Sequence, residues 1–489
     1  MPEFDRCSGI LLHITSLPSP YGIGTMGAAA HGFAEFLSAA GQSIWQMLPL
    51  GPTGFGNSPY QSFSSFAGNP YLIDLDELNR FGLDLSEYDW GQPGCVDYGK
   101  QYENRHAVLR KLYELSPAPA DMGAFMEKNS HWLPDYALFT ALKKHFSGMP
   151  WYMWPMDIRS RKPKAVEKYT ELLKDDIDFE CWVQYQFRRQ FDALAAHCRR
   201  LGIKMMGDLP IYVAPDSADV WADPHEFLLD DDFIPTEVAG VPPDYFSETG
   251  QLWGNPLYNW DKMKENGYAF WKNRLQAAAD IYDIIRLDHF RGFESYWSVP
   301  KGSENAIGGK WNPGPGEDFI DMLHEQLPHT LFVAEDLGII TDKVTQLREY
   351  AKMPGMAILS FAFQPDEESS YLPHNIEKDC VCYSGTHDNA PLRALKDELS
   401  DRQMQMIDDY CGSFEGIIRS GMVCPANVFI AQLQDWLDLG SESRMNTPGK
   451  SEDCWTWRLT KLPDIEMAEK ISRMTQTAFR CSKKEEHPI

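Results

Sequence analysis

The sequence predicts an α/β protein, a single (β/α)8 barrel of the TIM type with large insertions after its early strands. Short apolar runs of strand type alternate with stretches of helical periodicity, which is typical of parallel strands joined by crossover helices. Eight such runs can be counted, and eight strands close this barrel. The chain has 489 residues, whereas the barrel alone needs about 250, so we expect the surplus to lie in insertions.

The first β/α unit is the clearest part of this pattern. Residues 9–17 (GILLHITSL) are of strand type, residues 28–41 are rich in alanine and helical in period, and residues 43–51 return to strand type. Gly41 lies at the end of the helical stretch, where glycine commonly terminates a helix. These segments therefore predict a strand, a helix and the next parallel strand.

Two insertions interrupt the strands that follow. The first covers about residues 52–200 and ends in a helical pattern that leads directly into a strand at 203–213. The second covers about 214–280 and is rich in Asp, Pro, Gly and Trp. The remaining strands are expected at residues 283–290, 330–337, 356–363, 381–388 and 428–437. No linker, repeat or low-complexity tract divides the chain, so residues 1–489 should form one unit.

Three carboxylates directly follow three of these apolar runs. They are Asp288 in IIRLDHFRG, Glu335 in LFVAEDLG and Asp388 in CVCYSGTHDN. The C-terminal ends of the strands form the face of a parallel barrel that carries catalytic groups. Cleavage of a glycosidic bond needs one carboxylic acid and one carboxylate whose pKa values differ. The three acids suggest glycosidic chemistry, although their spacing does not say which acid does what.

Arg286 precedes Asp288 by two residues, so both side chains should point to the same side of the strand. A guanidinium beside a carboxylate favours the ionised form, which a nucleophile needs. The alternative is a structural ion pair inside the barrel, because such networks also occur without function. The sequence leaves both interpretations open.

Glu335 and Asp336 are adjacent, so only one of them can face the site from the end of a strand. Glu335 shares the inward period of Val333 and is the candidate general acid. A purely structural strand-end glutamate is the alternative.

We expect no metal and no cofactor. His387 precedes Asp388, and His289 follows Asp288, but neighbouring residues on a strand cannot easily chelate one ion, and no HxxxH or HExxH spacing occurs. The glycine-rich segment 51–59 lacks the Lys-Ser/Thr ending of a phosphate-binding loop.

Two loops are rich in aromatic residues. The segment around Phe55 and Tyr60 predicts a flexible lip over a cleft, with a plain surface turn as the alternative. The segment 241–260 combines turn formers with rings that we expect to be exposed and to bind a ligand. These rings are Tyr245, Phe246, Trp253 and Tyr258.

The net charge of −26, from 45 basic and 71 acidic residues, argues against a nucleic-acid partner, because such a partner repels acidic surfaces. The ten cysteines are scattered without a CxxC pair, as in reduced cytosolic proteins. The N-terminal apolar stretch is too short for a signal peptide, and no run approaches the roughly 20 apolar residues that cross a bilayer. We expect a soluble, cytoplasmic protein without a membrane partner; the oligomeric state stays open.

The chain resembles glycoside hydrolase family 77, the amylomaltases or 4-α-glucanotransferases of the α-amylase clan. The resemblance runs along the full length in blocks that follow one another in the family's order. These blocks are SGILLHITSLPSPYGIG, WQMLPLGPTG, SPYQSFSSFAGNPYLIDL, WLPDYALF, GDLPIYV, PPDYFS, GQLWGNPLY, RLDHFRG, VAEDLG, GTHDN and RMNTPG. Several such blocks in order are far more specific than any one of them. The resemblance implies a single catalytic barrel, and the first strand begins too early to leave room for an N-terminal starch-binding module.

The resemblance also implies roles for individual residues. Asp288 matches the nucleophile, Glu335 the general acid/base, and Asp388 the third acid, which binds sugar hydroxyls and steadies an oxocarbenium-like transition state. The positions that match family residues around the reacting sugar are Tyr60, Asp208, Arg286 and His387. The positions that match the acceptor side and its covering loop are Ser58, Asp244, Trp253 and His289, with Asn446 in a second loop near the cleft.

The implied reaction is a retaining transfer of α-1,4-glucan segments from a maltooligosaccharide or starch-type glucan to the 4-hydroxyl of glucose or another glucan. It would proceed by double displacement through a covalent glucosyl-enzyme, with the carboxyls of Asp288 and Glu335 about 5–5.5 Å apart. The alternatives are an α-glucan hydrolase of the same clan and a non-catalytic glucan-binding protein. Phe55 and Asn57 depart from residues common in the family, so preferences at the outer subsites do not carry over.

Overall fold

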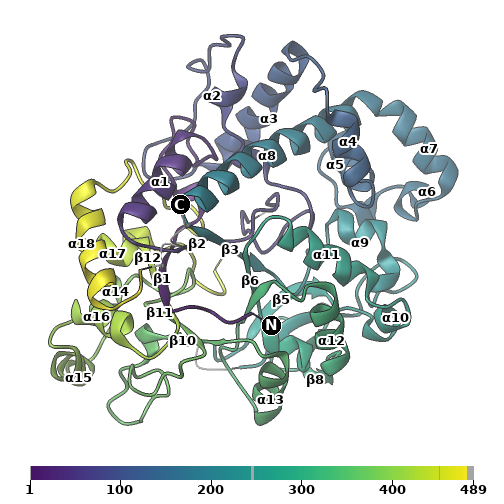
Figure 1. Ribbon diagram of the computed structural model, residues 1–489. Helices are drawn as coiled ribbons and strands as arrows, with labels where there is room; N and C mark the ends of the chain where they lie inside the picture. The colour runs from purple at the N-terminus through teal and green to yellow at the C-terminus, as the bar shows by residue number, and fades with distance from the viewer. Residues whose placement is uncertain (1, 55, 244–246, 451, 482–489) are drawn as a thin grey trace.

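The centre of the molecule is a sheet of eight parallel strands surrounded by helices (Figure 1). The computed structural model describes residues 2–54, 56–243, 247–450 and 452–481. The barrel strands are β1 (Cys7–Leu11), β2 (Ile44–Gln46), β3 (Lys204–Leu209), β6 (Ile284–Leu287), β9 (Leu331–Ala334), β10 (Gly355–Ile358), β11 (Cys380–Tyr383) and β12 (Val428–Gln432). Each predicted strand is present, and each is shorter than predicted because its last residues turn into the following loop.

The strands follow the order β10-β11-β12-β1-β2-β3-β6-β9. The N–H of Ala334 donates to the carbonyl oxygen of Pro354 over 3.0 Å, which joins the end of β9 to the start of β10. This contact brings the two edge strands together, so the predicted (β/α)8 barrel is confirmed.

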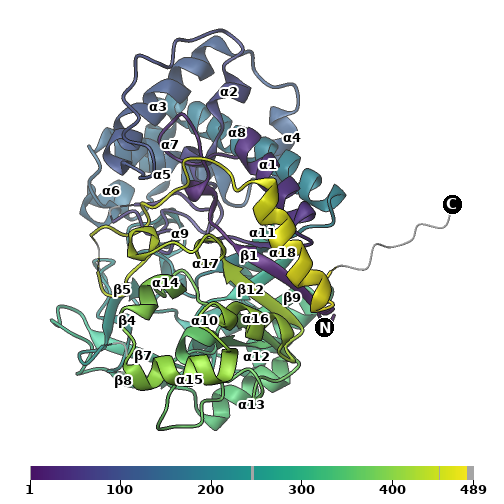
Figure 2. The ribbon, with the colours of Figure 1, turned by 90° about the vertical axis from the view of Figure 1, so that its left-hand side faces the viewer.

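The helices begin with α1 (Ala28–Ala39), whose predicted stop is present because Gly41 adopts a left-handed φ of 69°. The first insertion contributes α2 (Leu75–Leu78), α3 (Tyr98–Leu115), α4 (Met122–Lys128), α5 (Leu133–His145), α6 (Met156–Arg159), α7 (Pro163–Leu172) and α8 (Lys174–Arg200). The side chain of Asp97 caps α3 by accepting from the N–H of Lys100 over 3.1 Å. Figure 2 shows these helices stacked at one end of the molecule, above the barrel.

A second, smaller sheet stands beside the barrel, at the lower left of Figure 2. It is antiparallel, in the order β5-β4-β7-β8, and comprises β4 (Glu237–Val241), β5 (Gln251–Pro256), β7 (Ser295–Pro300) and β8 (Lys310–Pro313). The strands β7 and β8 come after β6, so a third excursion exists that the sequence did not predict. The strand β8 is exposed along most of its length, and it lacks the alternation of apolar residues that would have revealed it.

The remaining helices are α9 (Ala218–Ala222), α10 (Trp260–Glu265), α11 (Ala269–Ala279), α12 (Glu317–Gln326), α13 (Asp342–Ala351), α14 (Leu392–Lys396), α15 (Asp401–Cys411), α16 (Gly416–Val423), α17 (Leu433–Trp436) and α18 (Ile465–Thr477). The last of these packs on α1, where Gln42 Nε2 donates to Thr475 Oγ1 over 2.8 Å. Beyond it, Arg480 Nη1 donates to the carbonyl oxygen of Cys7 over 2.9 Å. This bond ties the segment after α18 to the first strand.

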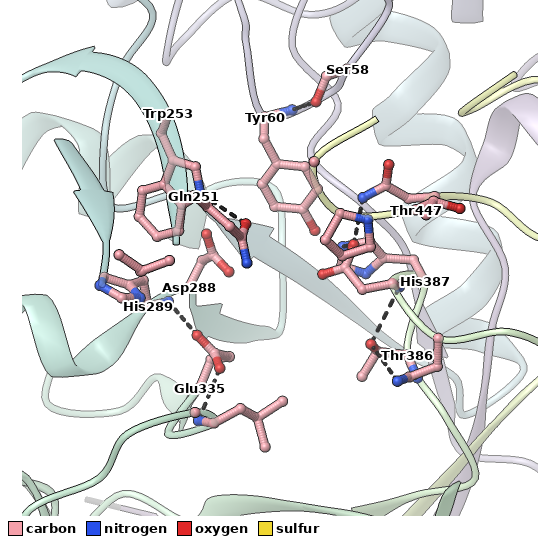
Figure 3. A pocket seen from close by; sticks show the side chains of 18 of the residues that line it. Ser58, Tyr60, Gln251, Trp253, Asp288, His289, Glu335, Thr386, His387 and Thr447 are labelled. Atoms are coloured by element: carbon pink, nitrogen blue, oxygen red, sulfur yellow. Dashed lines mark hydrogen bonds and ion pairs between the residues drawn. The ribbon is translucent and has the colours of Figure 1, made fainter. Parts of the chain in front are cut away.

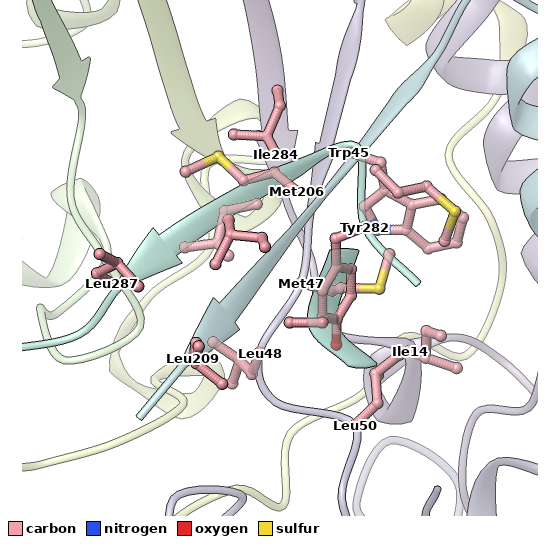
Figure 4. Close-up of a cluster of buried hydrophobic side chains, with 14 of the residues drawn as sticks. Ile14, Trp45, Met47, Leu48, Leu50, Met206, Leu209, Tyr282, Ile284 and Leu287 are labelled. Carbon is pink, nitrogen blue, oxygen red and sulfur yellow. The ribbon is translucent and has the colours of Figure 1, made fainter. Parts of the chain in front are cut away.

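Buried apolar side chains on the barrel strands and on the segments beside them form one packed cluster (Figure 4). Trp45 is fully buried and donates from Nε1 to the carbonyl oxygen of Leu12 over 2.8 Å. Met206 and Ile284, from β3 and β6, are also fully buried. Each such side chain stabilises the fold by about 1.5–3 kcal/mol, so the strand ends that carry polar residues stand on a rigid base.

No helix within the described ranges is long and apolar enough to span a membrane.

Candidate active site

A cavity of about 760 Å³ opens where the barrel strands end, and three acids line it. Asp288 follows β6, Glu335 follows β9, and Asp388 lies five residues after β11. Figure 3 shows Asp288 and Glu335 between Trp253 and His289 on one side and Tyr60 and His387 on the other. The cavity is therefore a cleft with acids in its centre and aromatic rings along its walls.

Backbone hydrogen bonds hold two of the acids at fixed positions. The N–H of Asp288 donates to the carbonyl oxygen of Leu209 over 3.1 Å, and the N–H of Glu335 donates to that of Leu287 over 3.0 Å. These bonds extend the strand ladder by one residue at each site. Both carboxyls are thus carried by the barrel and not by free loops.

Arg286 lies beneath Asp288 and contacts two carboxylates. Its Nη1 donates to Asp288 Oδ1 over 2.9 Å and to both oxygens of Asp208 over 2.7 and 2.6 Å. Asp208 is the register partner of Arg286 on β3, so the two side chains stand next to each other. Tyr60 donates from its hydroxyl to Asp208 Oδ2 over 2.7 Å. The predicted contact between Arg286 and Asp288 is present, and it is one of several contacts that also include Asp208 and Tyr60.

Arg286 is one of several groups that act on the pKa of Asp288. Burial raises the pKa of Asp288 well above its usual range; Arg286 opposes this shift, while the charges of Asp208, Glu335 and Asp388 add to it. One guanidinium shared between two carboxylates does not offset these effects. Arg286 therefore favours the ionised form of Asp288, as expected from the sequence, but Asp208 competes for the same positive charge.

Glu335 is fixed by two backbone donors. The N–H of His289 donates to Oε2 over 2.7 Å and the N–H of Leu337 donates to Oε1 over 3.0 Å. Burial raises the pKa of Glu335, while Arg286 and these two hydrogen bonds oppose the shift. With both pKa values raised, the pair of Asp288 and Glu335 can hold one proton between two carboxyl groups. One acid beside one carboxylate is the state that glycosidic chemistry requires.

Asp336 turns away from the cavity, as its adjacency to Glu335 predicts. Its Oδ1 accepts from the N–H of Met356 over 2.8 Å, and its Oδ2 lies 3.1 Å from Arg348 Nε. Asp336 therefore supports the junction of β9 with β10.

Asp388 is held by a loop from the C-terminal part of the chain. Asn446 Nδ2 donates to Asp388 Oδ1 over 2.6 Å, and Arg444 Nη2 donates to the carbonyl oxygen of Asp388 over 2.9 Å. His387 Nε2 lies 3.4 Å from the same Oδ1. The side chain of Asp388 is 43% exposed, so it remains open to a ligand in the cavity.

Stacked rings form the wall beside Asp388. The rings of Tyr60 and His387 lie 5.2 Å apart at 17°, and Trp455 lies 5.9 Å from each. Burial lowers the pKa of His387, although the charge of Asp388 opposes this. Behind it, burial lowers the pKa of His13 to about 3. His387 is thus a neutral, buried hydrogen-bonding group next to an exposed carboxylate.

The opposite wall carries Trp253 and His289. Their rings meet edge to face at 4.8 Å, and Trp253 Nε1 donates to Gln251 Oε1 over 3.1 Å. Burial lowers the pKa of His289 to about 3. Tyr258 was expected to be exposed near this wall, but it is 1% exposed and donates to the carbonyl oxygen of Ile211 over 2.7 Å. Tyr258 belongs to the core because it packs beneath the loop, among other buried rings.

The structure brings most of the expected site residues into one cavity. Those that line it are Ser58, Tyr60, Trp253, Arg286, Asp288, His289, Glu335, His387, Asp388 and Asn446. Ser58 Oγ accepts from the N–H of Tyr60 over 3.3 Å. Asp208 is buried below the cavity and reaches it through Arg286 and Tyr60.

Some expected residues cannot be placed. Asp244 lies outside the described residues, together with Phe55, Tyr245 and Phe246.

Several further residues line the cavity that the sequence did not single out, among them Gln251, Arg291, Trp311, Arg444 and Trp455. Gln251, Arg291 and Arg444 lie within the blocks GQLWGNPLY, RLDHFRG and RMNTPG, which could have pointed to them. Trp311 and Trp455 had no such signal beyond being aromatic. Across the described parts of the chain, no three His, Cys, Asp or Glu side chains are grouped so that they could hold a metal ion.

The sequence of this chain is similar to those of known proteins along almost its whole length. A family model described as 4-alpha-glucanotransferase matches residues 12–463. The chain is 44% identical over 476 residues to the 4-alpha-glucanotransferase of Thermus thermophilus, which covers 94% of this chain and 95% of that relative. It is 42% identical over 486 residues to the 4-alpha-glucanotransferase of Clostridium butyricum, covering 96% and 100%.

A solved structure is similar over nearly the whole length. The amylomaltase from Streptococcus agalactiae in complex with acarbose has a TM-score of 0.94 at 36% sequence identity. The similarity covers 98% of this chain and 100% of that one. The two chains therefore share the same overall fold.

Proposed function

The chain belongs to the 4-alpha-glucanotransferase family, glycoside hydrolase family 77, and on this premise we propose that its cavity transfers α-1,4-glucan segments from a maltooligosaccharide or starch-type glucan to the 4-hydroxyl of glucose or another glucan. The observation that carries the proposal is the convergence of Asp288, Glu335 and Asp388 in one cavity. The raised pKa values of Asp288 and Glu335 let the pair supply one acid and one carboxylate.

In the first step, Glu335 donates its proton to the glycosidic oxygen while the carboxylate of Asp288 attacks the anomeric carbon. The bond between the anomeric carbon and that oxygen breaks, the shorter glucan leaves with the proton, and a covalent glucosyl-enzyme forms. In the second step, the Glu335 carboxylate takes the proton from the 4-hydroxyl of an acceptor, whose oxygen displaces Asp288. Two displacements restore the α configuration, and both carboxyls return to their starting states.

The remaining groups position the sugar. Asp388 and the neutral His387 are placed to bind hydroxyls of the reacting glucose, and Arg286 stabilises Asp288 when it leaves as a carboxylate. Trp253 offers its ring on the acceptor side, where an acceptor sugar would displace water. We propose that this wall makes transfer faster than hydrolysis.

We also propose that residues 1–489 act as one catalytic unit in the cytoplasm. In support, one continuous buried core joins the barrel strands to helices of the first insertion, including Leu109 of α3 and Phe187 of α8. Maltooligosaccharides are the expected substrates.

Incubation of the protein with maltotriose, followed by chromatography of the products, tests the proposal. Glucose together with maltooligosaccharides longer than maltotriose supports transfer. Glucose and maltose alone would show a hydrolase, and unchanged maltotriose would show a binding protein. The Glu335→Gln variant, checked for an unchanged unfolding temperature, is the control for contaminating activity.

A further inference from the structure

Trp311, in strand β8, is a large aromatic side chain that the mechanism leaves unused. It lines the cavity, and it is 39% exposed. An indole ring with this much exposed area at the wall of a sugar-binding cavity is a surface on which the apolar face of a glucose ring can stack. The question is whether the ring is held in place or only covers its neighbours.

The ring of Trp311 is held from two directions. The guanidinium carbon of Arg291 lies 3.8 Å from the ring centroid, and the ring of Trp297, its register partner on β7, lies 5.1 Å away at 66°. Trp297 is itself fixed, because Nε1 donates to the carbonyl oxygen of Ala306 over 2.9 Å. A cation beneath an aromatic face and a cross-strand aromatic pair each stabilise one orientation of the ring.

Arg291 connects this ring to the loops that carry the acids. It lies three residues after Asp288, it is 5% exposed, and its Nη1 donates to the carbonyl oxygen of Ile339, four residues after Glu335. Its Nη2 donates to Ser295 Oγ over 3.3 Å. A shift of either acid-bearing loop would therefore move the support of Trp311, so the ring has a defined position relative to the reacting centre.

The small sheet sets the separation between Trp311 and Trp253. They lie on β8 and β5, the two edge strands of the order β5-β4-β7-β8. Three strand spacings of about 4.8 Å place these edges about 14 Å apart. At this spacing of the strands, Trp311 would meet a different sugar residue from Trp253, farther along the bound glucan.

We propose that Trp311, supported by Arg291, forms an outer acceptor subsite that stacks a glucose residue of a long acceptor glucan. This inference rests on the proposed transferase function and adds a preference for acceptor length. Glucose as an acceptor is too short to reach Trp311. Longer maltooligosaccharides gain the stacking contact and should bind more tightly.

The test compares Trp311→Ala with the wild type, with starch as donor and glucose, maltotriose or maltopentaose as acceptor. We expect the KM for maltopentaose to rise about three- to tenfold, with kcat and the KM for glucose unchanged. Trp311→Tyr should restore most of the loss. Tyr102→Ala is the matched control, since Tyr102 is 75% exposed on α3 and does not line the cavity.

Equal changes for glucose and maltopentaose, or no change, would overturn the subsite; a rise confined to donor chains would overturn its acceptor side. A binding measurement separates this result from failure of the proposed function. Maltopentaose is titrated by calorimetry into Glu335→Gln with and without Trp311→Ala. Weaker binding in the double variant supports the subsite even if the wild type fails to convert maltotriose, whereas equal binding refutes it.

Discussion

The backbone N–H of His289 donates a 2.7 Å hydrogen bond to Oε2 of Glu335, so the residue that follows Asp288 holds the carboxyl group of the other acid. His289 has a left-handed φ of 48°, a backbone conformation that is costly for a residue with a side chain. The peptide between Asp288 and His289 thus joins the two acids directly, and their separation is set by the barrel and this turn.

The first prediction concerns stereochemistry. Because the two carboxyls are joined by this turn, we expect them about 5–5.5 Å apart, as in retaining enzymes. The new bond should therefore be α-1,4. Proton NMR of the products formed from maltotriose measures this through the coupling of the anomeric proton, and a β-linked product would contradict the double displacement.

The second prediction separates the roles of the two acids. Asp288→Asn removes the nucleophile and Glu335→Gln removes the acid, so each should lower kcat at least about 100-fold with maltotriose. A maltosyl fluoride donor has a leaving group that needs little protonation. It should form a covalent adduct with Glu335→Gln, visible by mass spectrometry, but not with Asp288→Asn.

The neighbouring acid supplies the control for this experiment. Asp336→Asn makes the same kind of change one residue from Glu335, but the side chain faces Met356 and Arg348. It should reduce stability by about 1–3 kcal/mol and leave kcat near that of the wild type. A loss of kcat as large as in Glu335→Gln would mean that Asp336 reaches the substrate.

The third prediction uses the shared guanidinium. The charge of Asp208 raises the pKa of Asp288 and competes for Arg286. In Asp208→Asn the pKa of Asp288 should fall, so the nucleophile stays ionised to lower pH. The acidic limb of kcat/KM should therefore move to lower pH. The side chains of Arg286 and Asp208 are 5% and 1% exposed, so breaking this buried pair should destabilise the protein by about 3 kcal/mol.

A second buried acid is the matched control for the pH profile. Asp435 accepts from Ser384 Oγ over 2.5 Å and from the N–H of Leu392 over 2.7 Å. Within the described part of the chain, no hydrogen bond or ion pair joins Asp435 to Arg286. Asp435→Asn should lower stability without moving the acidic limb. An unmoved limb in Asp208→Asn would show that the charge of Asp208 does not act on Asp288.

The strands and the three acids could be predicted because their signals are local. An apolar run followed by an acid is visible within about ten residues, and barrel geometry then places all strand ends on one face. The pKa of Asp288 could not be predicted in the same way. It depends on the register that sets Asp208 beside Arg286, and a pairing between strands far apart in the sequence leaves no mark in either segment.

The missed residues have a similar explanation. Trp455 completes a wall with Tyr60, although the two lie at opposite ends of the chain. Trp311 stands on an exposed edge strand whose neighbours show no alternation of apolar residues. Both rings enter the site through packing between segments, and composition alone had suggested only that some aromatic residues would line a cleft.

The fourth prediction asks what protects the covalent intermediate from water. Trp253 packs edge to face on His289 at 4.8 Å and is fixed by Gln251, so its ring has one orientation at the wall of the cavity. Trp253→Ala opens this wall, and water should compete better for the glucosyl-enzyme. The ratio of hydrolysis to transfer with maltotriose should rise several-fold, measured as glucose and maltose released relative to longer products. Trp253→Phe keeps a flat ring and should stay near the wild-type ratio, and an unchanged ratio in Trp253→Ala would show that the intermediate is protected by other groups.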